Sequence, residues 1–219
     1  MIKYKWANLL CLVPFFLGLY VALSGDTFYE IEKVIFNISR IISPYADIPM
    51  RVITELGSAV GVILIAVIIV VWSASKKHFL DFGLPIALTI IISRVVNVIL
   101  KYSFDRPRPD FKVFDATESS FPSGHSQNNM AFYIIILLVA LMICNNHKKR
   151  LILKISLVSL PLLIGLTRVY FGVHYISDVL SGWSIGFIIA YNCYYIYFKY
   201  LYPKLKREEK INELSWTRT

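Results

Sequence analysis

Six apolar segments limit what this chain can fold into. A helix needs about 20 mostly apolar residues to cross a lipid bilayer. Segments of about that length lie near residues 6–24, 56–74, 79–100, 126–144, 151–167 and 179–200. We therefore expect an all-α fold, an integral membrane bundle of six transmembrane helices.

The composition agrees with a membrane protein and argues against other classes. Hydrophobic residues make up 57% of the 219 residues and charged residues 17%, against about 45–50% and about 25% in soluble domains. The length suits a single domain over residues 1–219. The net charge of +9 does not indicate a nucleic-acid partner, because the basic residues lie between apolar runs. The first apolar run is long for a signal peptide, which favours a retained helix.

The distribution of Lys and Arg orients the predicted bundle. With a cytosolic N-terminus, the inner loops and the tail 203–219 are rich in Lys and Arg. We expect a multi-pass protein of the cell membrane with both termini in the cytosol. The basic residues of these inner segments include Lys3, Lys5, Lys76, Lys77, Lys148, Lys149, Arg150 and Lys154. Five cations fall on the outer side and call for a function there, namely Lys101, Arg106, Arg108, Lys112 and Arg168.

Residues 28–42, between the first two predicted spans, carry apolar side chains at helical spacing. The stretch is too polar to cross a membrane. It predicts an interfacial helix between helices one and two, lying in the outer membrane interface. Packing of this stripe against the bundle is an equally good interpretation.

Polar residues from four distant parts of the sequence meet at the outer ends of the predicted helices. Lys101 ends the third span, and Arg108 and Pro109 follow it. Residues 122–125 lead into the fourth span, and Arg168 ends the fifth. His174 and Asp178 begin the sixth. We expect these side chains to form one site on the extracytoplasmic side.

The residue types indicate a phosphate-binding site. Lys101, Arg108 and Arg168 supply three cations, and guanidinium groups match phosphate oxygens. Gly124 lets the backbone approach an anion closely, and Ser123 adds a hydroxyl donor. The amides that begin the fourth helix favour an anion as well. Together these groups can stabilise the charge of a phosphoryl transition state.

Two histidines add reactive groups to that site. His174 and Asp178 are four residues apart and share a helix face, so the carboxylate can orient the imidazole. This predicts His174 as a nucleophile that forms a phosphohistidine. His125 then suits the general acid for the leaving oxygen. No acidic cluster has metal-ligand spacing, so we expect neither a metal nor a cofactor.

Three sequence motifs resemble those of the type 2 phosphatidic acid phosphatase superfamily. They read KYSFDRPRP at 101–109, PSGH at 122–125 and TRVYFGVHYISD at 167–178, with Thr167 in place of the usual Ser. The resemblance implies metal-independent hydrolysis of a lipid phosphate, with His174 as nucleophile, Asp178 as its partner and His125 as acid. Substrates of bacterial relatives include phosphatidylglycerophosphate, phosphatidic acid and undecaprenyl diphosphate.

Several questions stay open at this level. A phosphotransferase that passes the phosphoryl group to another acceptor shares the first half-reaction. Arg94 and Asn97 lie on the Lys101 face of their helix; Arg94 either contacts substrate or pairs with Glu55. Arg106 either helps to bind phosphate or, as the simpler interpretation, is an exposed loop cation. The expected partners are a lipid phosphate and the bilayer, with no oligomeric state indicated.

Overall fold

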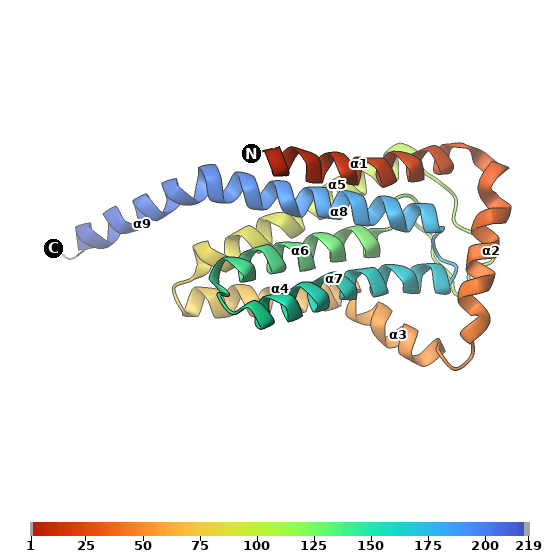
Figure 1. Cartoon of the computed structure of the whole chain (residues 1–219), viewed down its shortest axis with the longest axis horizontal. Helices are drawn as coiled ribbons and strands as arrows, with labels where there is room; N and C mark the ends of the chain where they lie inside the picture. The colour runs from red at the N-terminus through yellow and green to blue at the C-terminus, as the bar shows by residue number, and fades with distance from the viewer. Residues whose placement is uncertain (1, 217–219) are drawn as a thin grey trace.

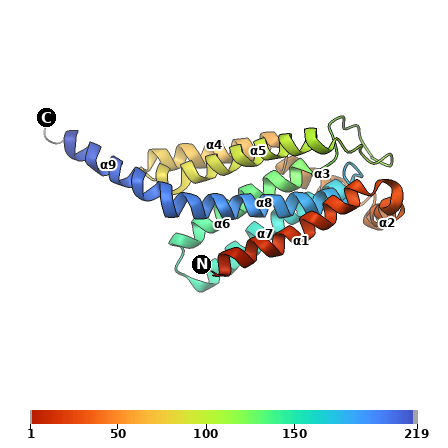
Figure 2. The same ribbon diagram turned by 90° about the horizontal axis from the view of Figure 1, so that it is seen from above.

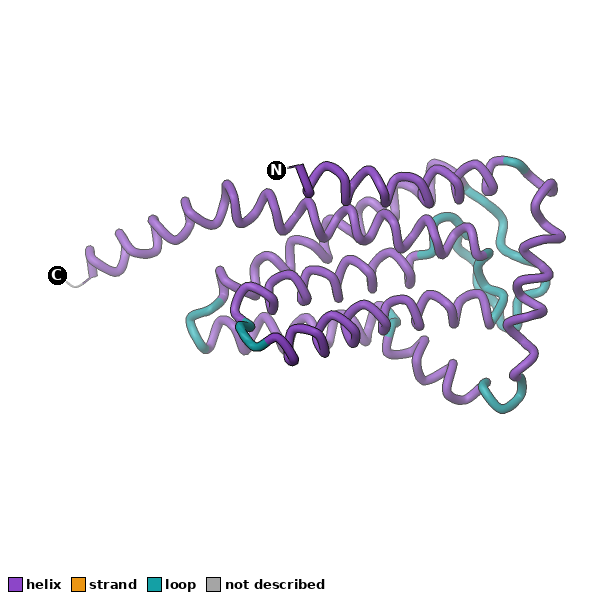
Figure 3. The backbone as a smooth tube through the Cα atoms, in the orientation of Figure 1, coloured by secondary structure: helices purple, strands orange, loops and turns teal. Residues whose placement is uncertain are grey.

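The computed structural model describes residues 2–216, and the side chains of residues 8–25 and 27–210. The described residues form helices joined by short loops, with no strand (Figures 1 and 3). The α-helices are α1 (Ile2–Leu23), α2 (Tyr29–Ser39), α3 (Asp47–Leu56), α4 (Ala59–Ser75), α5 (Leu84–Phe104), α6 (Gly124–Ile143), α7 (His147–Tyr170), α8 (Ile176–Ile196) and α9 (Tyr202–Trp216). The expectation of an all-α fold is confirmed.

Helix α6 occupies the centre of the bundle (Figure 2). It packs against α5, α7 and α8, and before its last turn its side chains are buried on every face, including Phe132 and Ile135, which are fully buried. The outer helices instead expose apolar side chains such as Ile68 of α4 and Ile155 of α7. This contrast suits a bundle in which lipid takes the place of water around the outer helices.

Two glycines bring α8 unusually close to α6. A methyl group added at Gly186 would lie 2.3 Å from the carbonyl oxygen of Gln127, and one added at Gly182 would lie 2.8 Å from that of Ser123. Small residues of this kind let membrane helices approach backbone to backbone. The amide of Ser123 accordingly donates to the carbonyl oxygen of Asp178 at 3.1 Å. The contact fixes the start of α8 beside the start of α6.

The six expected spans all fall on helices, but fewer of these meet the length and hydropathy of a span. Among the described residues, four helices qualify: Phe79–Phe104, Gly124–Ile143, His147–Tyr170 and Ile176–Lys210. A fifth qualifies if α3 and α4, which meet at a bend of 48°, count as one broken span. The apolar part of α1 described with side chains, Asn8–Leu23, is shorter. The fold is therefore a helical bundle with at least four candidate spans.

Helix α2 crosses the end of the bundle where α7 ends and α8 begins (Figure 1). The predicted helix at 28–42 is present and ends in a 3₁₀ turn, Arg40–Ile42. Its Glu32 side chain is buried against the bundle, while Ile31 and Ile38 stay exposed. One face thus packs on the bundle, and the opposite face offers apolar side chains to the surroundings. The sequence did not predict α3, which follows it and is joined to it by the Arg40–Asp47 ion pair at 2.9 Å.

The C-terminal helix continues well beyond the expected sixth span. A π-helical turn, Tyr197–Leu201, joins α8 to α9, which runs to Trp216 and extends from the end of the bundle opposite to α2 (Figure 1). Most of the expected tail 203–219 is therefore helical. Residues 217–219 of that tail, and the side chains of Lys3 and Lys5, lie outside the described part of the chain.

Candidate active site

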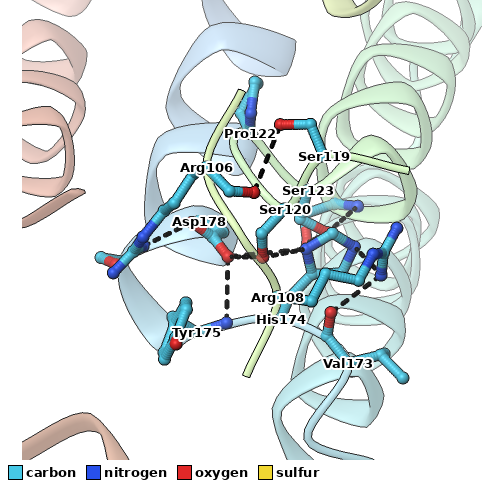
Figure 4. Close-up of polar contacts among 12 residues, drawn as sticks. Arg106, Arg108, Ser119, Ser120, Pro122, Ser123, Val173, His174, Tyr175 and Asp178 are labelled. Atoms are coloured by element: carbon cyan, nitrogen blue, oxygen red, sulfur yellow. Dashed lines mark hydrogen bonds and ion pairs between the residues drawn. The ribbon is translucent and has the colours of Figure 1, made fainter. Parts of the chain in front are cut away.

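The expected site residues meet at one end of the bundle, where α5 and α7 end and where α6 and α8 begin (Figures 1 and 4). Residues 105–123, the longest segment without a helix, connect α5 to α6 across this end. Backbone hydrogen bonds hold the segment, including Ser120 N to Arg106 O at 2.8 Å and Val113 N to Phe171 O at 2.9 Å. The connection can therefore place side chains against the ends of four helices.

His174 and Asp178 face each other inside the protein. Their side chains are 3% and 0% exposed. The imidazole Nδ1 lies 3.6 Å from Oδ2 of Asp178, too far for a direct hydrogen bond. The Ser120 hydroxyl lies between them, donating to Oδ2 at 2.5 Å with Nδ1 at 3.3 Å (Figure 4). The Tyr175 amide also donates to Oδ2, at 3.0 Å, so the carboxylate is held from several directions.

This environment favours a neutral imidazole at His174. Burial lowers its pKa to about 4, against the opposing effect of the Asp178 carboxylate. The Arg108 Nη1 atom lies 3.4 Å from the other ring nitrogen, Nε2. Arginine has no lone pair to offer, so Nε2 carries the free electron pair and Nδ1 the proton. The lone pair faces Arg108, where an anion would bind.

Three cations from different segments line the same cavity as His174. Arg108 is anchored by its own loop and by α7–α8, with Nε donating to Glu118 O at 2.6 Å and Nη1 to Val173 O at 2.8 Å. Lys101 donates to Glu118 Oε2 at 3.0 Å and to the Ser119 carbonyl oxygen at 2.8 Å. In both side chains other donor hydrogens remain for a ligand.

Arg168 is the most enclosed of the three cations. It is 7% exposed, and its Nη1 donates to the Thr54 hydroxyl of α3 at 2.7 Å. Its Nε has no hydrogen-bond partner among the described residues. A buried guanidinium donor without a partner is unfavourable unless a ligand occupies the site. Arg168 is thus placed to receive an anion.

Two cavities meet at this site. The first, of about 470 Å³, is lined by the three cations and both histidines and also by apolar residues of α4 and α5. Its lining includes Lys101, Arg108, His125, Arg168 and His174 as well as Val62, Ile63 and Ile90. The second, of about 550 Å³, is more polar and is lined by Arg51, Thr54, Glu55 and Ser58. His125 and Arg168 line both cavities. These two side chains therefore lie at the boundary between the more apolar cavity and the more polar one.

The PSGH segment forms the start of α6. The Ser123 hydroxyl caps the helix by accepting from the Ser126 amide at 3.3 Å and from its hydroxyl at 2.9 Å. Gly124 lines the first cavity and packs against Asn97, whose Oδ1 would lie 2.9 Å from an added methyl group. Pro109 is buried. A larger residue at position 124 would therefore have to displace the Asn97 side chain.

The prediction that Arg106 is an exposed loop cation is wrong. Its side chain is 10% exposed and pairs with Asp178 at 2.6 Å and with Glu32 at 2.8 Å. Motif spacing gives no sign of this, because Glu32 comes from α2, more than 70 residues earlier. Ser120 was also missed, since a serine in a loop carries no signal before the fold places it beside a histidine.

Arg94 and Asn97 reach the same cavity from α5. Arg94 lines the first cavity next to Lys101, and no ion pair joins it to Glu55 within the described residues. Asn97 is buried and donates to Gln127 Oε1 at 3.0 Å, while its Oδ1 has no partner in the described part of the chain. The structure thus brings Arg94 to the cavity rather than to α3.

Comparison with known families agrees with the motifs. The family model described as the PAP2 superfamily matches residues 82–202. The chain belongs to the PAP2 superfamily. Among curated proteins, phosphatidylglycerophosphatase B of Bacillus subtilis is 32% identical over 81% of this chain and 88% of the relative. Undecaprenyl-diphosphatase BcrC of the same organism is 31% identical over 74% of this chain and 80% of the relative. These PAP2 relatives are named as lipid phosphatases.

Two solved structures share the fold. The crystal structure of a transmembrane PAP2-type phosphatidylglycerolphosphate phosphatase from Bacillus subtilis superimposes with a TM-score of 0.77 and 28% identity. That match covers 87% of this chain and 96% of the other. LpxE of Aquifex aeolicus matches with a TM-score of 0.58 and 28% identity, over 78% of this chain and 94% of the other. The chain is thus an enzyme of the PAP2 family of lipid phosphatases, with membrane-spanning helices.

Proposed function

We propose that the protein hydrolyses a lipid phosphate or diphosphate without a metal ion, through a phosphohistidine intermediate. One observation carries the proposal: the unprotonated Nε2 of His174 faces Arg108 at the wall of a cavity that Lys101 and Arg168 also line. Three fixed cations can neutralise the phosphoryl oxygens. This charge leaves no need for a divalent ion to hold the substrate.

In the first step, Nε2 of His174 attacks phosphorus and forms a P–N bond. The P–O bond to the lipid breaks, and the leaving oxygen takes a proton from His125, which lines the same cavity. The imidazole becomes cationic as the bond forms. Asp178, reached through the Ser120 hydroxyl, stabilises that charge. Arg108, Lys101 and Arg168 stabilise the phosphoryl oxygens throughout.

In the second step, water replaces the lipid. His125 accepts a proton from the water, whose oxygen attacks phosphorus, and the P–N bond to His174 breaks to release inorganic phosphate. The polar cavity on the far side of His125 and Arg168 gives water a route to this position. That route favours hydrolysis over transfer of the phosphoryl group to a second lipid acceptor.

The shape of the first cavity favours a lipid. Its cationic end continues into apolar walls from α4 and α5, which include Val62 and Ile90. A phosphate at the cations therefore leaves an alkyl or isoprenoid chain against apolar residues. The named activities of the relatives suggest phosphatidylglycerophosphate and undecaprenyl diphosphate, and phosphatidic acid has the same chemistry. Arg94, beside Lys101 in the cavity wall, is placed to contact a head group or second phosphate.

We further propose that the site lies on the extracytoplasmic side of the cell membrane, with six spanning helices, both termini in the cytosol and α2 in the outer interface. The basic inner loops support this orientation. The exposed Ile31 and Ile38 of α2 support contact with the interface. All of the chain then acts as one membrane phosphatase domain, with the motifs at 101–178.

Release of phosphate by the purified protein tests the proposal. The protein in detergent, with EDTA present and no acceptor lipid, is given undecaprenyl diphosphate, phosphatidylglycerophosphate or phosphatidic acid. We expect release from at least one, and none from the His174→Ala variant. Turnover that needs an added acceptor lipid would replace hydrolysis by transfer, and loss of activity in EDTA would refute metal independence.

A further inference from the structure

A chain of buried charges runs behind the catalytic pair. Glu32 of α2, Arg106 of the 105–123 segment and Asp178 of α8 follow one another at 2.8 Å and 2.6 Å. Their side chains are 3%, 10% and 0% exposed. Removing one partner of such a set leaves an uncompensated buried charge.

Arg106 approaches Asp178 from the side opposite to the phosphate cavity. It does not line the cavity that holds the three other cations; it lines a separate small cavity with Glu32, Tyr29 and Tyr175. Its guanidinium lies 4.0 Å from the centre of the Tyr175 ring. Its Nη1 also donates to the Ser177 hydroxyl at 2.8 Å. These contacts leave Arg106 no path to substrate, so any effect on the reaction passes through Asp178.

Glu32 completes the arrangement from a different helix. One carboxylate oxygen, Oε2, pairs with Arg106, and the other, Oε1, accepts from the Ser177 amide at 3.2 Å and from the Ser177 hydroxyl. Ser177 is the second residue of α8, whose amides have no partners within the helix. Glu32 therefore holds Arg106 and the start of α8 together.

We propose that Arg106 and Glu32 are positioning residues that determine how strongly the Asp178 carboxylate acts on His174, both before and after His174 attacks phosphorus. This inference rests on the proposed function. The Arg106 cation offsets part of the Asp178 charge, so His174 stays neutral and nucleophilic in the free enzyme. Glu32 offsets part of the Arg106 charge in turn, so Asp178 can still stabilise the cationic phosphohistidine.

The signs of the two effects differ, which makes the inference testable. Without Arg106, the Asp178 carboxylate acts on His174 undiminished, and the pKa of His174 rises. Without the Glu32 charge, Arg106 acts on Asp178 alone, and the pKa of His174 falls further. Other charged or titratable groups that face His174 are unchanged in both variants: Arg108 of the connecting segment, Arg168 of α7 and His125 of α6.

The experiment measures kcat/KM of phosphate release against pH for variants in detergent. All variants are compared on the same lipid, so the ionisation of the substrate affects every pH profile equally. On the acid side of this profile, kcat/KM falls as His174 gains a proton. We expect Arg106→Gln to shift this acid limb to higher pH by about one unit and to lower kcat about tenfold or more. Arg106→Lys keeps the charge, so its acid limb returns toward that of the wild type while kcat stays lower. Glu32→Gln moves the acid limb down and lowers kcat.

Two control variants separate positioning from stability. Glu30→Gln removes an exposed carboxylate two residues from Glu32 and leaves the profile unchanged. Arg40→Gln breaks the Arg40–Asp47 ion pair and lowers the melting temperature without moving the profile.

Folded Arg106→Gln with the acid limb and kcat of the wild type would overturn the inference. If that variant does not fold, the double variant with Glu32→Gln, which buries no extra net charge, decides the question by the same criterion. If neither folds, an unchanged acid limb in Glu32→Gln overturns it. Failure of the wild type to release phosphate from any lipid would refute the proposed function instead.

Discussion

Replacement of Gly186 by alanine tests how the fold positions the site. The added methyl group would lie 2.3 Å from the Gln127 carbonyl oxygen, 2.9 Å from Met130 Cβ and 3.1 Å from the Ala131 amide nitrogen. Two of these three atoms belong to the backbone of α6, which no rotamer change can move away. Ordinary contacts begin at 3.4 Å, so α8 must retreat from α6 by about 1 Å.

The magnitude follows from opposing contributions. Alanine favours a helix over glycine by about 1 kcal/mol, whereas overpacking a tight contact costs about 1–3 kcal/mol. Because the obstacle is backbone, the upper value applies, and we expect a net destabilisation of about 2 kcal/mol. A displacement of about 1 Å between α6, which carries His125, and α8, which carries Asp178, can lower turnover about 100-fold.

The assay combines thermal unfolding of the purified protein in detergent with kcat and KM for phosphate release. We expect a lower melting temperature and a loss in kcat that exceeds any change in KM, since the cations on other segments still bind substrate. Ala74→Val, which enlarges an exposed residue of α4, serves as the control and leaves both unchanged. Gly186→Ala with the stability and kcat of the wild type would refute the close-packing argument.

Three further outcomes are expected. Ser120→Ala removes the hydroxyl that joins Asp178 to His174. We expect this variant to lower kcat about 10-fold to 100-fold with little change in KM. An unchanged kcat would show that the hydroxyl makes no contribution to turnover. Folded His174 stays neutral down to about pH 4, whereas in the unfolded chain it gains its proton near pH 6.5. Stability therefore falls as pH drops through this window and levels off below it, and His174→Gln removes this contribution to the slope of melting temperature against pH. The topology is tested in a background from which Cys11, Cys144 and Cys193 have been removed. A membrane-impermeant thiol reagent should label Lys112→Cys in intact cells and should label Lys148→Cys only after lysis. The reverse pattern would invert the proposed topology.

The sequence predicts the helices and the proximity of His174 to Asp178 well because both depend on local spacing. Long apolar runs give helices, and the spacing of four positions keeps His174, just before α8, close to Asp178 in the first turn of that helix. The structure does bring Lys101, Arg108, His125 and Arg168 to one cavity, as their shared position at helix ends predicts. Spacing of this kind survives folding because a helix is rigid over a turn or two.

The rest of the site depends on contacts that spacing does not encode. Arg106 stands in a loop beside Arg108, yet it turns toward Glu32 of α2 instead of the cavity. The partnership of Ser120 with Asp178 arises only when the 105–123 segment folds over α8. The helix α3 was missed because Pro49 and several charged residues interrupt its apolar pattern, although Thr54 on it binds Arg168.

The most direct test of the account is chemical identification of the residue that carries the phosphoryl group. A ³²P-labelled lipid phosphate is mixed with the His125→Gln variant, in which breakdown of the intermediate is slowed, and the reaction is quenched in alkali. If His174 is the nucleophile, we expect base-stable, acid-labile label on the peptide that contains His174, and none in the variant that also carries His174→Ala. Label on any other residue, or phosphate release by folded His174→Ala at the wild-type rate, would contradict it.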